Sequence, residues 1–198
     1  AVIADGWETT ARGHLAETPV KIDSTGTNDN ARMTPGFEDL FDRGGLAKSD
    51  WRIITGTICD ERDKQLFLTA GETPGGIGRE QLFEDVEVVV NARCETLRED
   101  SAFGIGLYYK DGEPTLSMFV FPAGVDLIGS GKARFDLPAM WEMSDYHAYR
   151  LVARDGKAQI WLEQFLLGEI PIDNGPYCAA VLAQNVTVTL DMVRVTGI

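Results

Sequence analysis

Asp85 and Glu87 are the two carboxylates whose spacing comes closest to that of a catalytic pair. They lie two residues apart at the start of an apolar run, so a β-strand would turn both side chains to the same face. A retaining glycoside hydrolase needs a nucleophile and an acid about 5 Å apart, and neighbours on one strand face can meet that requirement. The three residues after Glu87 are valines, and no further carboxylate follows on this predicted strand. The favoured interpretation of Asp85 and Glu87 is therefore that they lie on the solvated outer face of a sheet.

Other hydrolytic chemistries find less support in the sequence. The chain has two histidines, His14 and His147, and no Gly-x-Ser-x-Gly segment, so a Ser/His/Asp triad is not expected. His147 is predicted to be a hydrogen-bonded residue at the end of a sheet. The glycine-rich stretch Thr73–Arg79 lacks the Lys-Ser/Thr ending of a phosphate-binding loop. It is predicted to be a mobile loop that is free to border a binding groove.

Aromatic and arginine side chains provide the candidates for ligand binding. Flat aromatic rings stack on the apolar face of a pyranose, while arginine and carboxylate groups hydrogen-bond to its hydroxyls. The candidate ligand-binding residues are Trp161, Arg150, Tyr108, Arg93, Trp141 and Tyr146, with Glu87 as the accompanying carboxylate. The alternative is that the N-terminal residues cover Trp161 and make it an ordinary packing residue. The sequence leaves both interpretations open.

Charge and hydropathy narrow the range of partners. The chain of 198 residues carries 31 acidic and 18 basic side chains, which gives a formal charge of -13. A field of this sign repels polyphosphate and anionic lipid headgroups, so nucleic acid and membrane surfaces are not expected as partners. No apolar stretch approaches the roughly 18 residues that a membrane span needs. Carbohydrate remains the expected partner.

Cysteine usage and the start of the chain bear on metal binding and location. The three cysteines, Cys59, Cys94 and Cys178, allow one disulfide at most, match no zinc spacing and are expected to be small buried side chains. No cofactor is required, and a structural calcium ion is allowed, although Asp23–Asn30 does not match a calcium loop. Because the first residue is Ala1, an export signal or a neighbouring domain of a larger protein can precede it, and a secreted or periplasmic location is expected.

The elements that must position these residues are short β-strands. From Phe37 onward, apolar residues alternate with polar ones and are interrupted by Gly, Pro, Asp and Asn, which is typical of an all-β domain. Residues 1–36 lack this pattern and are predicted to be an irregular extension that packs on a single domain of residues 37–198. The predicted strands are Phe37–Asp42, Trp51–Thr55, Thr57–Asp60, Gln65–Thr69, Asp85–Arg93, Phe103–Lys110, Thr115–Phe121, Asp126–Ile128, His147–Arg154, Lys157–Leu162, Leu166–Pro171 and Asn185–Thr196.

Two Asp-Gly turns predict β-hairpins, one at Lys110–Glu113 and one within Tyr146–Leu162. In the second hairpin a two-residue turn at Asp155-Gly156 places Arg154 opposite Lys157 and fixes every pair above it. Arg150 then lies across from Trp161 on the face away from the core, within reach of a cation–π contact. In the last strand the apolar parity changes near Asp191-Met192, which predicts a β-bulge.

The order of these segments resembles the concanavalin A-like lectin/glucanase superfamily, in particular bacterial laminin-G-like and keto-disaccharide-hydrolase-like (DUF1080) domains. The resemblance rests on segments spread over Phe37–Ile198. The chain departs from it at Glu163-Gln164-Phe165, where members often carry an Asp-Gly turn. It also lacks the Glu-x-Asp-x-x-Glu pattern of the glucanases. The matching segments are Phe37–Asp42, Ser49–Trp51, Tyr146–Val152, Ala158–Trp161 and Leu190–Val195. The resemblance implies a two-sheet antiparallel jelly-roll sandwich whose concave face commonly meets glycans, with a structural calcium ion in some members.

Three functions are therefore compared. The first is a glycan-binding or interaction module that uses Trp161 and its neighbours on a concave sheet. The second is a glycoside hydrolase or polysaccharide lyase with Glu87 or Asp85 as the acid/base. The third is a structural adhesion domain without a sugar ligand.

Overall fold

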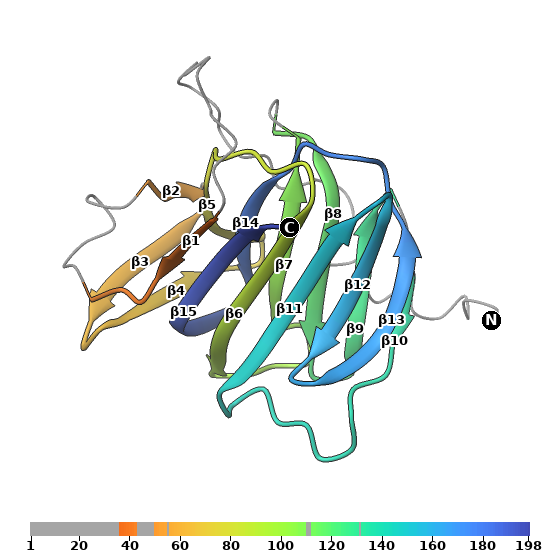
Figure 1. Cartoon of the computed structure of the whole chain (residues 1–198). Helices are drawn as coiled ribbons and strands as arrows, with labels where there is room; N and C mark the ends of the chain where they lie inside the picture. Colours follow the sequence, from red (N-terminus) through yellow and green to blue (C-terminus); the bar gives the residue numbers. More distant parts are fainter. Residues whose placement is uncertain (1–35, 43–49, 55, 110–111, 131) are drawn as a thin grey trace.

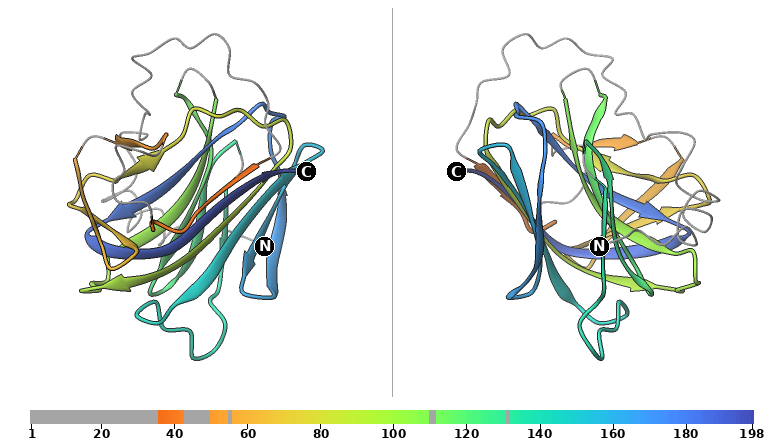
Figure 2. Two further views of the ribbon diagram at one scale, coloured as in Figure 1. Left: turned by 60° about the vertical axis from the view of Figure 1, so that its left-hand side comes forward. Right: turned by 90° about the vertical axis from the view of Figure 1, so that its right-hand side faces the viewer.

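The computed structural model describes residues 36–42, 50–54, 56–109, 112–130 and 132–198. Its elements are all β-strands, arranged as two antiparallel sheets that pack face to face (Figures 1 and 2). This confirms the predicted all-β jelly-roll sandwich. The predicted extension of residues 1–36 lies outside the described residues, apart from Gly36, and so does part of the Lys110–Glu113 turn.

The larger layer, sheet A, contains eight strands and holds both hairpin strands of the candidate site. Strand β1 pairs with β15 beside the main path of the sheet. The order along the path is β13 (Phe165–Pro171), β12 (Lys157–Leu162), β11 (His147–Arg154), β6 (Val86–Glu95), β15 (Val186–Gly197), β4 (Gln65–Ala70) and β3 (Thr57–Arg62), and β1 spans Gly36–Asp39.

The second layer, sheet B, contains seven strands and lies behind sheet A in Figure 1. Strands β7 and β8 are antiparallel neighbours, as the first Asp-Gly turn predicts. The order is β10 (Ala133–Phe135), β9 (Gly124–Gly129), β8 (Pro114–Phe121), β7 (Ala102–Tyr108), β14 (Cys178–Gln184), β5 (Gly75–Gly78) and β2 (Arg52–Ile54).

The β11–β12 hairpin has the predicted register throughout, from Arg154 opposite Lys157 to Arg150 opposite Trp161. Its turn residues Asp155 and Gly156 have φ angles of 50° and 70°, and positive φ at both positions defines a type I′ turn. This turn matches the twist of the flanking strands, so the sequence of two residues sets which face each hairpin side chain occupies. The predicted bulge in β15 is also present, between Leu190 and Met192.

The core lies between the sheets and consists of the inward-facing residue of each alternating pair. Leu151 and Val90 of sheet A and Ile105 and Met118 of sheet B have no exposed surface. Each such side chain contributes about 1.5–3 kcal/mol through burial. None of the three cysteines forms a disulfide; Cys94 is buried in this core, Cys59 packs against it, and Cys178 is buried in a separate apolar cluster.

The structure corrects the interpretation of Thr73–Arg79 as a mobile loop. Gly75–Gly78 form strand β5, which is buried and lies between β14 and β2. A Cβ atom at Gly76 would overlap the Val181 carbonyl oxygen, so glycine allows the two backbones to approach closely. Glycine here indicates close packing of strands rather than a turn.

Two further strands, β10 and β14, are absent from the predicted set. Strand β14 is covered on both faces, and all seven of its residues are buried. A strand of this kind shows no alternation of apolar and polar residues. Its alanines, Ala179, Ala180 and Ala183, also have a low β propensity, so neither signal marks it.

Candidate functional site

The outer face of sheet A, which points away from sheet B, carries the best candidate site. Strand alternation buries Val88, Val90 and Leu151 in the core and turns their neighbours outward. Antiparallel pairing then brings outward-facing residues from β12, β11 and β6 into rows across the sheet. Residues far apart in sequence become neighbours on one surface.

Trp161 and Arg150 lie opposite each other, and Glu87 lies diagonally from Arg150, opposite Val152. We call these three residues, Trp161, Arg150 and Glu87, the Trp161 group. The Arg150 guanidinium carbon lies 5.1 Å from the centroid of the Trp161 ring. The Arg150 Nε donates to Glu87 Oε1 at 2.6 Å, and both side chains are partly exposed. The indole Nε1 of Trp161 has no hydrogen-bond partner among the described residues. The carboxylate thus orients the arginine, and the arginine covers one part of the indole.

Both proposed catalytic carboxylates have structural partners. Glu87 is paired with Arg150, and Asp85 Oδ1 accepts a hydrogen bond from the backbone N–H of Asp155 at 3.2 Å. Asp85 thereby connects the start of β6 to the β11–β12 turn. The role of either residue as an acid or base stays a prediction.

A second set of contacts, the Tyr146 bridge, consists of Tyr146, Gln65 and Arg93. Gln65 Nε2 donates to the Tyr146 hydroxyl at 2.6 Å, and the Arg93 guanidinium carbon lies 5.1 Å from the Tyr146 ring centroid. Partial burial raises the pKa of Tyr146, so its hydroxyl stays protonated to a higher pH than that of an exposed tyrosine. The bridge joins strand β4 to the residue that precedes β11.

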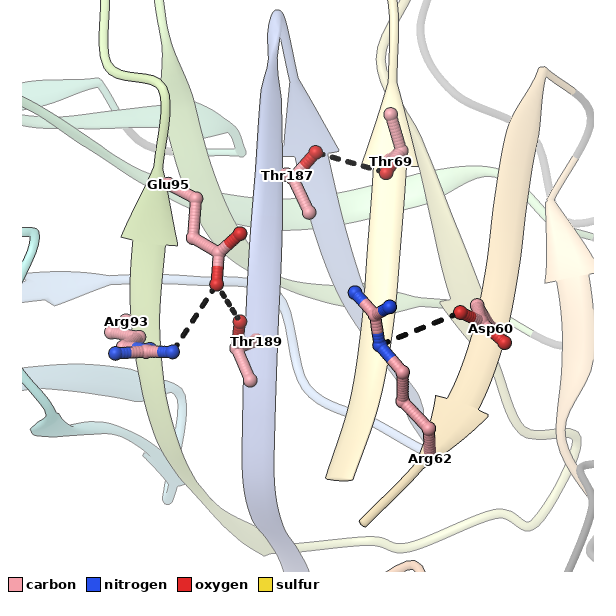
Figure 3. Close-up of polar contacts among 7 residues, drawn as sticks. All are labelled: Asp60, Arg62, Thr69, Arg93, Glu95, Thr187 and Thr189. Carbon is pink, nitrogen blue, oxygen red and sulfur yellow. Dashed lines mark hydrogen bonds and ion pairs between the residues drawn. The ribbon is translucent and has the colours of Figure 1, made fainter. Parts of the chain in front are cut away.

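Polar contacts continue from the bridge across β15, β4 and β3 (Figure 3). Glu95 Oε1 accepts hydrogen bonds from Arg93 at 3.3 Å and from the Thr189 hydroxyl at 3.0 Å. The hydroxyls of Thr69 and Thr187 lie 2.9 Å apart, and Arg62 forms an ion pair with Asp60 at 3.6 Å. These side chains contact one another and lie outside the Trp161 group.

The structure places Tyr108 elsewhere, on the outer face of sheet B. Its side chain is 1% exposed and packs in an apolar cluster that includes Phe119 and Leu182. Its ring lies over Gly106, where a Cβ atom would meet it. Tyr108 is therefore not brought together with Trp161.

Trp141 also has a packing role. Its ring stacks on His147 at a centroid distance of 3.7 Å and meets Tyr149 edge-on, against the core. His147 Nε2 lies 2.9 Å from the Glu142 carbonyl oxygen, and its Nδ1 lies 3.2 Å from Glu163 Oε1. His147 is a hydrogen-bonded residue at the end of a strand, as predicted.

Sequence reasoning missed Gln65 in the site and Asp126 elsewhere. The alternation in Gln65–Ala70 was the available signal for Gln65, because it turns Gln65 outward. Asp126 is 3% exposed on the outer face of sheet B, and its Oδ1 lies 3.7 Å from Arg134 without a hydrogen bond in the described part of the chain. Burial raises the pKa of the Asp126 carboxyl, and Arg134 opposes this shift.

The described residues contain neither a metal-binding cluster nor a membrane-spanning helix. No cluster of three or more His, Cys, Asp or Glu residues there is arranged to hold a metal ion. Calcium binding therefore stays a prediction. The described residues also include no helix long and apolar enough to cross a bilayer.

Comparison with solved structures identifies the fold class. The chain is similar to a β-glucanase of Bacillus licheniformis (TM-score 0.63, 12% identity, 84% of this chain and 100% of that chain). It is also similar to a laminarinase of Rhodothermus marinus (0.65, 12%, 81% and 96%) and to the carbohydrate recognition domain of Emp47p (0.62, 13%, 83% and 96%). No protein-family profile and no curated protein sequence matches the chain.

These neighbours, together with the two-sheet topology, show that the chain has the jelly-roll fold of these glucanases and lectin domains. At such low identity the likeness establishes the fold and leaves the activity to be argued from the site. The narrower keto-disaccharide-hydrolase assignment stays a prediction.

Proposed function

We propose that this protein is a glycan-binding module and that it binds its ligand on the outer face of sheet A through the Trp161 group. The observation that carries the proposal is the contact of Arg150 with both Trp161 and Glu87. It places an aromatic ring beside a guanidinium and a carboxylate on one partly exposed surface. Sugar-binding sites combine these kinds of group, because a pyranose has one apolar face and a rim of hydroxyls.

Pre-organisation supports the same proposal. Arg150 is held by Glu87 before any ligand arrives, so less side-chain freedom is lost when the ligand binds. The named activities of structural neighbours, a β-glucanase, a laminarinase and a carbohydrate recognition domain, make a carbohydrate ligand the most economical choice. A ligand of this class is compatible with the predicted secreted or periplasmic location.

Hydrolysis is less well supported than binding. Glu87 Oε1 is engaged by Arg150 and Asp85 Oδ1 by the Asp155 backbone, so each carboxylate has a structural contact that accounts for its position without catalysis. A hydrolase or lyase is retained as the alternative function, because glucanases are among the structural neighbours. Reducing-end and unsaturated-product assays on the binding mixtures separate the two functions, since a binding module releases no product.

The binding experiment uses the full chain with laminarin, mixed-linkage β-glucan, galactomannan and mucin glycans, followed by thermal shift and calorimetry. Trp161→Ala is expected to weaken binding of the active glycan at least about 10-fold, the effect of losing an anchoring aromatic. Phe67→Ala is the matched control, because Phe67 also lies under an arginine, Arg62 at 4.2 Å, on β4 outside the Trp161 group. Unchanged binding by Trp161→Ala contradicts the proposal.

A further inference from the structure

Ala148 is the smallest side chain on the outer face of β11. It lies between Tyr146 and Arg150 along the strand, is partly exposed, and pairs with Asn91 of β6. At about 3.3 Å per residue, the Cα atoms of Tyr146 and Arg150 are at most roughly 13 Å apart, because Tyr146 precedes the first residue of β11. The surface is therefore lowest between two long side chains.

Both long side chains are held away from Ala148 by their own partners. Arg150 reaches toward Glu87, which pairs in register with Val152 and so lies on the side of Arg150 remote from Ala148. Tyr146 extends across the sheet to Gln65. Neither side chain needs to move for a ring to occupy the space above Ala148.

The groups beside Ala148 can hydrogen-bond to hydroxyls. Asn91 lies opposite Ala148 and donates through Nδ2 to Asp191 at 3.3 Å, which orients its amide. Glu163 Oε1 accepts from the Ala148 backbone N–H at 3.0 Å and lies 3.2 Å from His147 Nδ1. An amide and a fixed carboxylate thus border the position on two sides.

Charge at this position favours an uncharged ligand. The flanking guanidinium groups each have a carboxylate partner, Glu87 for Arg150 and Glu95 for Arg93. A carboxylate or sulfate on the ligand would compete with these acids, and it would approach a chain of formal charge -13. Neutral hydroxyls can join the existing pairs without displacing them.

We infer that Ala148 forms the floor of a subsite for one uncharged sugar ring, bordered by Trp161 and Arg150 on one side and Tyr146 on the other. The inference rests on the proposed function and specifies its substrate class: a neutral glycan, as opposed to a uronic-acid or sulfated one. According to this inference, the small side chain of Ala148 determines that a sugar ring can bind at this position.

The test compares Ala148→Leu, which fills the space above the floor, with Ala148→Ser, which keeps the side chain small. Laminarin, mixed-linkage β-glucan and galactomannan serve as neutral probes, and polygalacturonate and alginate as anionic probes. Ala148→Leu is expected to weaken binding of the neutral probe at least about 10-fold, and Ala148→Ser to change it less than about threefold. Thr187→Leu, on β15 and outside the subsite, is the matched control for an added apolar group.

The outcomes separate this inference from the proposed function. Wild-type binding by Ala148→Leu, together with loss of binding by Trp161→Ala, overturns the Ala148 subsite and leaves glycan binding in place. Stronger binding of the anionic probes overturns the uncharged class. Absence of binding to every probe removes both. Circular dichroism and the melting temperature of Ala148→Leu check that its fold is intact. Ala148→Val, a smaller enlargement with a high β propensity, replaces it if Ala148→Leu does not fold.

Discussion

The side-chain amide of Gln65 donates a hydrogen bond to the Tyr146 hydroxyl at 2.6 Å, across the two central strands β6 and β15. The two residues are 81 positions apart in the sequence. Arg93 of β6 contacts the Tyr146 ring from one side of this span. The contact divides the outer face of sheet A into the part with Trp161 and the part with the threonine hydroxyls.

Removing this hydrogen bond should affect binding more than stability. The pair is exposed, so Tyr146→Phe is expected to lower the free energy of unfolding by only about 0.5–1 kcal/mol. Because the ring is then no longer held toward Gln65, it can occupy the space over Ala148 and weaken glycan binding several-fold. Urea denaturation and calorimetry measure the two effects, and Gln65→Ala should reproduce both. A large loss of stability without a change in affinity contradicts the assigned role.

The ion pair of Glu87 with Arg150 should have a measurable coupling energy. Arg150 is 38% and Glu87 18% exposed at the side chain, so solvent screens part of the attraction. A double-mutant cycle with Glu87→Gln and Arg150→Met is expected to give about 1 kcal/mol, at the upper end for surface pairs. The exposed pair Arg62–Asp60, at 3.6 Å, serves as the comparison and should give a smaller value. Equal couplings would argue against a special role for the Trp161 group.

Gly104 should tolerate no side chain. A Cβ atom there would lie 2.7 Å from the Met118 carbonyl oxygen and 2.9 Å from the Phe119 ring. Gly104→Ala is therefore expected to destabilise the protein by roughly 1–3 kcal/mol, as overpacking does. Gly71→Ala is the control, because a Cβ atom at Gly71 meets nothing within 4 Å, and its effect should stay within about 0.5 kcal/mol. Thermal unfolding of both variants provides the measurement.

The buried carboxyl of Asp126 predicts a pH-dependent stability. Burial raises its pKa in the folded state, so folding favours the protonated form. Its contribution to stability is complete below the unfolded-state pKa, about 3.9, and is lost as the pH rises through the folded-state pKa. Asp126→Asn should therefore melt at a higher temperature than the wild type at pH 7, and the difference should shrink toward pH 4. A difference that grows on acidification would reverse the assigned sign.

The structural features that could be predicted from the sequence are those determined by residues close together along the chain. The Asp155-Gly156 turn sets the pairing of β11 and β12, so the cation–π contact of Arg150 with Trp161 follows from the hairpin alone. In the same way, the change of apolar parity locates the bulge in β15. Both features are confirmed because local geometry determines them.

Features that depend on the order of strands were not predictable. The partners of Arg150 and Tyr146, Glu87 and Gln65, come from β6 and β4, and only the assembled sheet brings them together. Tyr108 was placed among the ligand-binding candidates because the sequence does not indicate which of the two sheets its strand belongs to. Strand β14 was missed because a strand buried on both faces has no alternating pattern.

The pairing of β1 with β15 has a mechanical consequence. Gly36 lies opposite Thr196 and Asp39 opposite Val193, so the start of β1 and the end of β15 are at the same end of the pair. Tension applied between residues 36 and 198 therefore loads the hydrogen bonds one after another, as in unzipping, instead of all at once in shear. In an optical trap attached at these two residues, we expect β1 to peel away at low force before the two sheets yield in a separate event at higher force.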